Sequence, residues 1–250
     1  MNQPPSIWLR PERSARGPVP EHSRAEIARA AVALADQGGL AAVTMRSVAA
    51  AIGTGPASLY RYVGTRDEIL ELMVDEAAGE YHDDSPAPGE SLTPLAGLLR
   101  LARQARQVFG RHPWLTGLPS VGSLPGPNAI AFTEQVLAIL DGTELTPVAR
   151  LETVGIFTGL VRLLAQTEAD QRRAGQELAE WQGALAGYLT AAVSGGRHPH
   201  LAAALAGQGT DPGAVTGGDP GPADLFDRTL ARILAGLLAP PGSQLPEGTA

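Results

Sequence analysis

The chain has 250 residues, a net charge of −7, no cysteine and only 4% aromatic residues. The lack of cysteine excludes disulfide bonds, thiolate metal sites and a cysteine nucleophile. No stretch approaches the roughly 18 to 20 continuous apolar residues of a membrane span, and the N-terminus lacks the apolar core of a signal peptide. We therefore expect a cytoplasmic protein with no membrane partner.

Capping residues predict a first helix after a Pro- and Arg-containing arm over residues 1–20, which we expect to be flexible. Ser23 and Glu26 have the S-x-x-E spacing of a capping box. Apolar residues then recur at helical spacing until Gly38 and Gly39 end the pattern. Ala and Leu, which are strong helix formers, are abundant throughout.

Three further short helices follow within 40 residues. Thr44 is a favourable N-cap for the second helix, and Gly53 stands where a left-handed C-terminal cap is needed. Gly-Pro begins the third helix, over residues 55–64. A second capping box at residues 65–68 begins the fourth helix.

The remaining residues also show helical periodicity, after a Pro-, Asp- and Gly-rich break that begins at His82. We predict an amphipathic helix from Leu95 that ends at the sequence GRHPW, followed by helices over about 128–140, 146–174, 177–193 and 223–239. The Gly- and Pro-rich residues 195–222 are predicted to form a mobile loop around a short apolar piece at 201–206. No run has the period of two that is typical of strands, so we predict an all-α protein.

Charge separates the two parts of this chain. Residues 1–74 carry eight Arg and seven acidic residues, a net charge of +1, which leaves −8 for the remainder.

Two short helices joined by a tight Gly turn and braced by a preceding helix form a helix-turn-helix arrangement, whose second helix enters the DNA major groove. We therefore predict a helix-turn-helix DNA-binding domain over 21–82 and a helical-bundle domain over 83–250.

The third helix has outward positions that suit a groove. Leu59 and Val63 lie four apart and face inward, which leaves small, hydroxyl-bearing and cationic side chains outside. Small residues permit close approach, hydroxyls bond phosphates or base edges, and Arg pairs with guanine or a phosphate.

The stretch AVTMRSVAAAIGTGPASLYRYVGTRDEIL resembles the DNA-binding signature of the tetracycline-repressor (TetR) family. It matches at Thr44, at the Val-Ala pair of the second helix, at Gly53, at Ser-Leu-Tyr in the third helix and at Arg-Asp-Glu in the fourth. It departs at Arg61, where many members carry another residue type. The segments RHPWLTGL and DLFDRTLARILAGL are similar to regulatory domains of an actinobacterial subgroup.

The resemblance implies a homodimer that binds double-stranded, palindromic operator DNA and an unidentified small-molecule effector. The DNA-contacting residues that it implies, with their neighbours in that surface, are Thr44, Arg46, Ala57, Ser58, Tyr60, Arg61, Tyr62, Thr65 and Arg66. We expect dimerisation through the helix at 147–174 and the final helix, whose apolar stripes would pack as a four-helix bundle across a twofold axis.

A pocket between bundle helices would be lined by apolar anchors and a few polar residues. We name as candidate effector-binding residues His112, Trp114, Phe132, Phe157, Thr158, Arg162 and Trp181. The five His residues show no close helical pair, so we expect no metal and no cofactor. No catalytic cluster is apparent, so we expect no enzyme activity.

Repression of transcription is the leading interpretation. Operator position decides between repressor and activator, so an activator with the same DNA-binding domain remains an alternative. A second alternative is an all-α ligand-binding protein without DNA activity, because the acidic body offers no bulk attraction to DNA.

Overall fold

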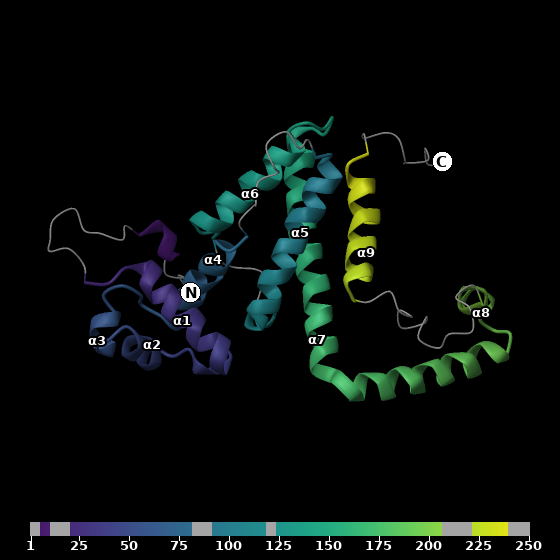
Figure 1. The fold of residues 1–250 in the computed structure, drawn as a ribbon, viewed down its shortest axis with the longest axis horizontal. Helices are drawn as coiled ribbons and strands as arrows, with labels where there is room; N and C mark the ends of the chain where they lie inside the picture. Colours follow the sequence, from purple (N-terminus) through teal and green to yellow (C-terminus); the bar gives the residue numbers. More distant parts are fainter. Residues whose placement is uncertain (1–5, 11–20, 82–91, 119–123, 207–221, 240–250) are drawn as a thin grey trace, which may run out of the picture.

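The computed structural model describes residues 6–10, 21–81, 92–118, 124–206 and 222–239. Within these ranges the secondary structure consists of helices and turns without any strand, which confirms the all-α prediction. The described helices include none that is both long and apolar enough to cross a membrane. Figure 1 shows one group of short helices, α1 to α4, beside a bundle of longer ones.

The first group contains α1 (Arg24–Gly38), the 3-10 turn η2 (Leu40–Ala42), α2 (Met45–Ala51), α3 (Pro56–Leu59) and α4 (Arg66–Ala78). The predicted N-caps are confirmed, but of the three only Thr44 forms a full capping box, with Ser47. The hydroxyls of Ser23, Thr44 and Thr65 accept hydrogen bonds from the backbone N–H of Glu26, Ser47 and Glu68. Each cap satisfies a donor that the helix itself leaves unpaired.

The third helix is shorter than predicted. Regular helix ends at Leu59, and turns continue the chain to Val63, whose N–H still donates to the Leu59 carbonyl at 3.1 Å. Leu59 and Val63 are both fully buried, as predicted. A four-residue helix has little stability of its own, so packing of these two side chains holds it in place.

The prediction that residues 1–20 form a flexible arm is wrong for residues 6–10. Residues Ile7–Leu9 form a 3-10 turn, η1, and Ile7 is fully buried in the core. The Pro and Arg content suggested flexibility, but burial of Ile7 and hydrogen bonds to α1 and α4 fix this segment. The other residues of the predicted arm lie outside the described ranges.

The second group contains α5 (Pro94–Arg111), η3 (Pro113–Gly117), α6 (Pro127–Leu140), α7 (Pro147–Ser194), α8 (Pro199–Ala206) and α9 (Pro222–Leu237). Helices α5, α6, α7 and α9 enclose an apolar core that includes Leu98, Leu140, Phe157 and Leu230. Part of the predicted mobile loop is helix α8, and residues 207–221 of that loop lie outside the described ranges.

Gly175 breaks α7 into the two segments that the sequence predicted. Its backbone has φ 49° and ψ −122°, a conformation that only glycine adopts without strain. After this break the helix turns away from the bundle and ends near α8 (Figure 1). The first segment of α7 therefore belongs to the bundle core, whereas the second extends from it.

Candidate nucleic-acid interface and effector site

The turn between α2 and α3 is closed by a Schellman motif at the end of α2. The Thr54 N–H donates to the Ala49 carbonyl at 2.9 Å, and the Gly53 N–H donates to the Ala50 carbonyl at 3.1 Å. Gly53 has φ 74°, the left-handed conformation that this motif requires. The motif fixes the angle between the two helices, so α3 presents a defined face.

Most of the predicted DNA-contacting side chains lie on the surface of this unit. Seven of the nine are exposed: Thr44, Arg46, Ala57, Tyr60, Arg61, Thr65 and Arg66. The exposed fraction of Tyr60 is 56%, which is large for an aromatic residue that has a buried Leu beside it in the chain. The unit occupies one end of the molecule, so α7, α8 and α9 do not obstruct it (Figure 1).

Two of the predicted residues, Tyr62 and Thr44, have side-chain partners among the first group of helices. Ser58 and Tyr62 are half-buried, and the Tyr62 ring lies edge-on to His22 with 6.1 Å between ring centroids. The exposed Thr44 uses its hydroxyl to cap α2, where it forms a capping box with Ser47. The capping box fixes the start of α2, and the ring contact holds Tyr62 against His22.

Arg66 has a structural role that the sequence pattern did not reveal. Its Nε donates to the Val43 carbonyl at 2.8 Å, and its Nη2 donates to the Leu40 carbonyl at 2.7 Å. The guanidinium therefore ties the first turn of α4 to the chain that leads into α2. Both acceptors lie 23 to 26 residues away in sequence, which is why local patterns gave no sign of them.

Three aromatic rings form a cluster: one lies just after α4, one in α6 and one in α7. Tyr81 follows α4 and packs on Phe132 with centroids 4.8 Å apart, and Phe132 stacks on Phe157 at 6.4 Å. Burial raises the pKa of Tyr81 to about 12, although the nearby Arg162 opposes this shift. Tyr81 was not among the predicted effector residues, although it continues the four-residue spacing of the buried Ile69, Met73 and Ala77.

Buried acceptor oxygens lie on α5, α6 and α7. The side-chain carbonyl oxygens of Gln104 in α5 and Gln135 in α6 have no hydrogen-bond partner among the described residues. The same holds for Oε1 of Glu168 in α7, whose other carboxylate oxygen accepts from Arg106. Because an unpaired buried acceptor costs about 1 to 3 kcal/mol, such groups mark places where a ligand donor would be favoured.

Of the remaining effector candidates, Thr158 and Trp181 do not reach the aromatic cluster, whereas Arg162 lies near its Tyr81. Arg162 donates to the Leu118 carbonyl after η3. Thr158 is exposed and bonds its own helix through the Val154 carbonyl. Trp181, with an exposed fraction of 58%, lies beyond the Gly175 break. The structure therefore brings together Phe132 and Phe157 and leaves Thr158 and Trp181 outside their cluster.

His112 and Trp114 lie where the first group of helices meets the second. The His112 Nδ1 and the Trp114 Nε1 both contact Oδ1 of Asp36 in α1, each at 2.7 Å. The His112 Nε2 lies 3.0 Å from a carboxylate oxygen of Glu80, just after α4. These two candidates therefore connect the bundle to α1 and α4.

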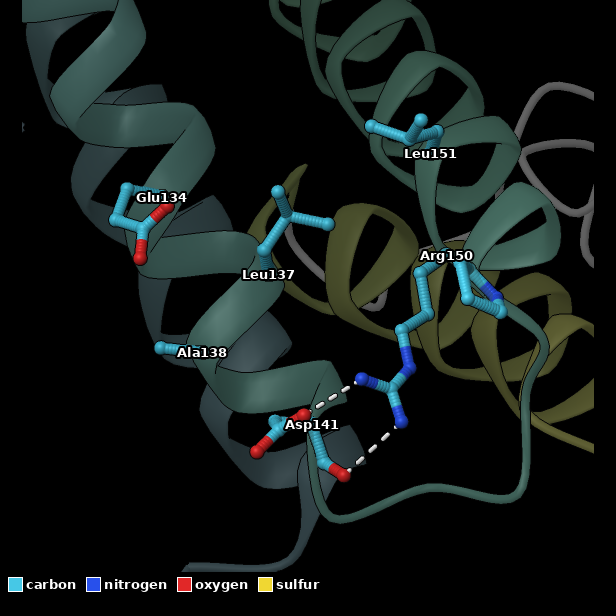
Figure 2. Close-up of a pocket in the computed structure, with 7 residues that line it drawn as sticks. Glu134, Leu137, Ala138, Asp141, Arg150 and Leu151 are labelled. Atoms are coloured by element: carbon cyan, nitrogen blue, oxygen red, sulfur yellow. Dashed lines mark hydrogen bonds and ion pairs between the residues drawn. The ribbon is translucent and has the colours of Figure 1, made fainter.

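A shallow groove of about 520 Å³ runs between α6 and the start of α7 (Figure 2). Two of its polar residues pair with each other: the Arg150 guanidinium donates to the Asp141 carboxylate at 2.6 Å and to the Asp141 carbonyl at 3.1 Å. Leu137 and Leu151 face it from the two helices. None of the predicted effector residues lines this groove.

Both domains match known families. The model for the C-terminal domain of tetracyclin repressor-like proteins matches residues 86–240, and the model for bacterial regulatory proteins of the tetR family matches residues 27–73. The HTH-type transcriptional repressor DrrR1 of Streptomyces coeruleorubidus is 32% identical over 200 residues, which cover 78% of this chain and 73% of that protein. The TetR family protein ActR of Streptomyces coelicolor, solved in complex with actinorhodin, is 26% identical with a TM-score of 0.73 over 90% of this chain and 99% of that chain. Apo ActR is 28% identical, with a TM-score of 0.70 over 89% of this chain and 97% of that chain. The chain therefore belongs to the TetR family of DNA-binding transcriptional regulators, and it is not an enzyme.

Proposed function

We propose that the protein is a homodimeric repressor that binds a palindromic operator through α2 and α3 and is released by a hydroxylated aromatic small molecule bound among α5, α6 and α7. The observation that carries the proposal is the exposed row of side chains on the α2–α3 unit. Arg46, Tyr60 and Arg61 offer two cations and a phenol at the unobstructed end of the molecule.

These side chains divide between positioning and readout. Arg46 and Arg61 carry fixed positive charges that attract phosphates, and Arg also forms paired hydrogen bonds with guanine. Ala57 adds no bulk where the helix would meet base edges. The Tyr60 hydroxyl is a donor at the flank of the helix, a position that suits a phosphate oxygen.

Dimerisation is supported by an exposed apolar stripe on α7. Val148, Leu151 and Leu163 have exposed fractions of 66, 60 and 59%. Gly155 and Gly159 lie between them at the helical spacing of one face, and a Cβ at either position would meet no atom within 4 Å. Two copies of such a stripe pack closely, because glycine lets helix backbones approach each other.

The second copy sets the geometry of DNA binding. A twofold axis through the α7 stripes would place two α3 helices on the same side of the dimer. The two major-groove half-sites of a palindrome lie about 34 to 36 Å apart. The proposal therefore predicts an operator with two inverted half-sites one helical turn apart.

The chemistry of the effector follows from the bundle interior. The rings of Tyr81, Phe132 and Phe157 offer stacking surfaces to a planar aromatic molecule. The unpaired oxygens of Gln104 and Gln135 accept hydrogen bonds, so the ligand needs donors such as phenolic hydroxyls. Actinorhodin, the compound bound in the similar structure of ActR, is the first molecule to test.

An effector releases DNA only if it binds the shape that does not fit the operator more tightly than the shape that does. A coupling free energy of about 1 to 3 kcal/mol would change operator affinity about 5- to 150-fold.

The DNA-binding proposal is tested by selecting bound duplexes from random DNA and measuring affinities of variants by fluorescence anisotropy. Arg46→Ala and Tyr60→Ala should each weaken binding about tenfold or more, and Arg46→Ala should also lower the salt dependence because phosphate contacts release counterions. Arg197→Ala, which removes an exposed Arg between α7 and α8, is the charge-matched control. Equal operator affinity of all three variants would reject the proposed DNA-contacting surface.

The effector proposal is tested with the same duplex and actinorhodin. Release should need more compound in Phe132→Ala, which removes a stacking ring, and in Gln135→Leu, which removes an acceptor. Thr158→Val changes a candidate outside the cluster and serves as the control. Identical release curves for Gln135→Leu and the unmodified protein would argue against the site.

A further inference from the structure

We propose that residues Ser6–Arg10 form a clasp that joins the DNA-reading domain to the first turn of α6, with Trp8 as its central positioning residue. This inference rests on the proposed function, because it concerns how a change in the bundle reaches α2 and α3. It assigns a role to a segment that precedes the family match at residues 27–73.

The clasp lies along one face of α4. Glu68, Glu71 and Asp75 follow the i, i+3, i+7 spacing of a single helix face. Ser6 donates its hydroxyl hydrogen to Glu71 at 2.9 Å, and Arg10 donates to Glu68. The two ends of the clasp therefore hold two carboxylates of the same face.

Two further contacts fix the clasp to α1 and to the core. The Arg24 guanidinium of α1 donates to the carbonyls of Ile7 and Arg10 at 2.9 and 3.0 Å. The Ile7 side chain is fully buried. The segment is therefore held by α4, by α1 and by the apolar core, although it contains only one turn of helix.

The third carboxylate of this face crosses the domain boundary. Asp75, with an exposed fraction of 5%, accepts hydrogen bonds from the backbone N–H groups of Asn128 and Ala129 at 3.3 and 3.0 Å. The helix itself offers no acceptor to these two N–H groups of the first turn of α6, so Asp75 of α4 acts as their cap. In return, the side-chain amide of Asn128 donates from Nδ2 to the backbone carbonyl of Asp75 at 3.0 Å.

Trp8 closes the arrangement over Gly126. A Cβ at position 126 would overlap the Asp75 carboxyl group and would lie 2.6 Å from Cζ2 of Trp8. The indole, the Asp75 carboxylate and the start of α6 therefore meet where only glycine leaves room. Because Trp8 packs beside the cap, it keeps water away from the hydrogen bonds between Asp75 and α6 and holds α4 and α6 together.

Hydrogen exchange of the Asn128 and Ala129 amides reports directly on this contact. In Trp8→Ala both amides should exchange about tenfold faster, because the cap becomes open to solvent. Leu9→Ala removes a neighbouring side chain of the same turn whose exposed fraction is 67%, and it should leave both rates unchanged. Unchanged amides of α2 in Trp8→Ala would show that the reading domain remains folded.

Operator binding supplies the second readout. Coupling is reciprocal, so adding the selected operator duplex to the unmodified protein should change exchange at Asn128 and Ala129, far from the DNA. In Trp8→Ala the duplex should still bind, but this distant response should be lost. The clasp is overturned if Trp8→Ala behaves like Leu9→Ala without DNA, or if its response to the duplex equals that of the unmodified protein. If the unmodified protein binds no duplex, the proposed function is rejected, whereas the DNA-free comparison still decides the clasp.

Discussion

Replacing Arg66 with alanine distinguishes a structural role from a DNA-contacting role for a residue that family resemblance assigns to the operator. In the structure its guanidinium donates to the carbonyls of Val43 and Leu40. These bonds join α4 to the chain before α2. We therefore expect Arg66→Ala to reduce stability more than it reduces the intrinsic affinity for DNA.

The magnitude follows from the two hydrogen bonds. A hydrogen bond to a charged group contributes about 1.5 to 3 kcal/mol, and a typical neutral one about 1 kcal/mol. Because Arg66 is exposed and water competes for both partners, we take about 1 kcal/mol for each bond. The loss of about 2 kcal/mol corresponds to a fall in Tm of about 4 to 8 °C for a chain of this size.

Thermal unfolding by circular dichroism and operator binding at 25 °C measure the two roles separately. Arg66→Lys keeps the charge, but one ammonium group does not reproduce the planar fork that reaches both carbonyls. We therefore expect the Lys variant to lose stability and to keep the salt dependence of DNA binding. An Arg66→Ala protein with an unchanged Tm and the weak DNA binding of Arg46→Ala would refute the structural role.

Two further predictions concern the bundle. Burial raises the pKa of Tyr81 above its ordinary value to about 12, so the neutral phenol stabilises the fold; this stability is complete below about pH 10 and is lost as the pH rises to about 12. The loss should be at most about 2.7 kcal/mol in urea unfolding, and Tyr81→Phe should abolish it. Leu163→Glu places a charge in the α7 stripe and should weaken the dimer at least about tenfold in sedimentation equilibrium, because an unpaired charge is costly to bury. Leu124→Glu, at an exposed apolar residue outside the stripe, should sediment like the unmodified protein; dissociation of both variants, or of neither, would argue against the stripe.

Local signals predicted the helix boundaries well. Ser23, Thr44 and Thr65 cap helices because each needs only a backbone N–H a few residues later in the chain. Likewise, the change of pattern near Gly175 indicated two helical segments, and the structure has its backbone break there. Such features depend on neighbours in the sequence, so a sequence is sufficient to find them.

The tertiary contacts of the same residues could not be predicted in this way. His112 bonds Asp36 across 76 residues, and Asn128 bonds Asp75 across 53. A polar residue at such a position has no periodic signal, because its partner lies in another domain. Ile7 gave no signal for the same reason: one buried residue in a Pro- and Arg-containing segment has no helical period to reveal it.

The contacts of α4 explain how a structural change in the bundle would be transmitted to α2 and α3. At its start, Arg66 bonds the carbonyls before α2, and near its end Asp75 caps α6. Asp75 is buried, so a movement of α6 away from α4 would leave a carboxylate without donors, at a cost of several kcal/mol. Movement of the two helices together avoids that cost. If an effector displaces α6, the Asp75 contact therefore favours a displacement of α4 in the same direction. Through Arg66, this displacement of α4 would also move the segment before α2.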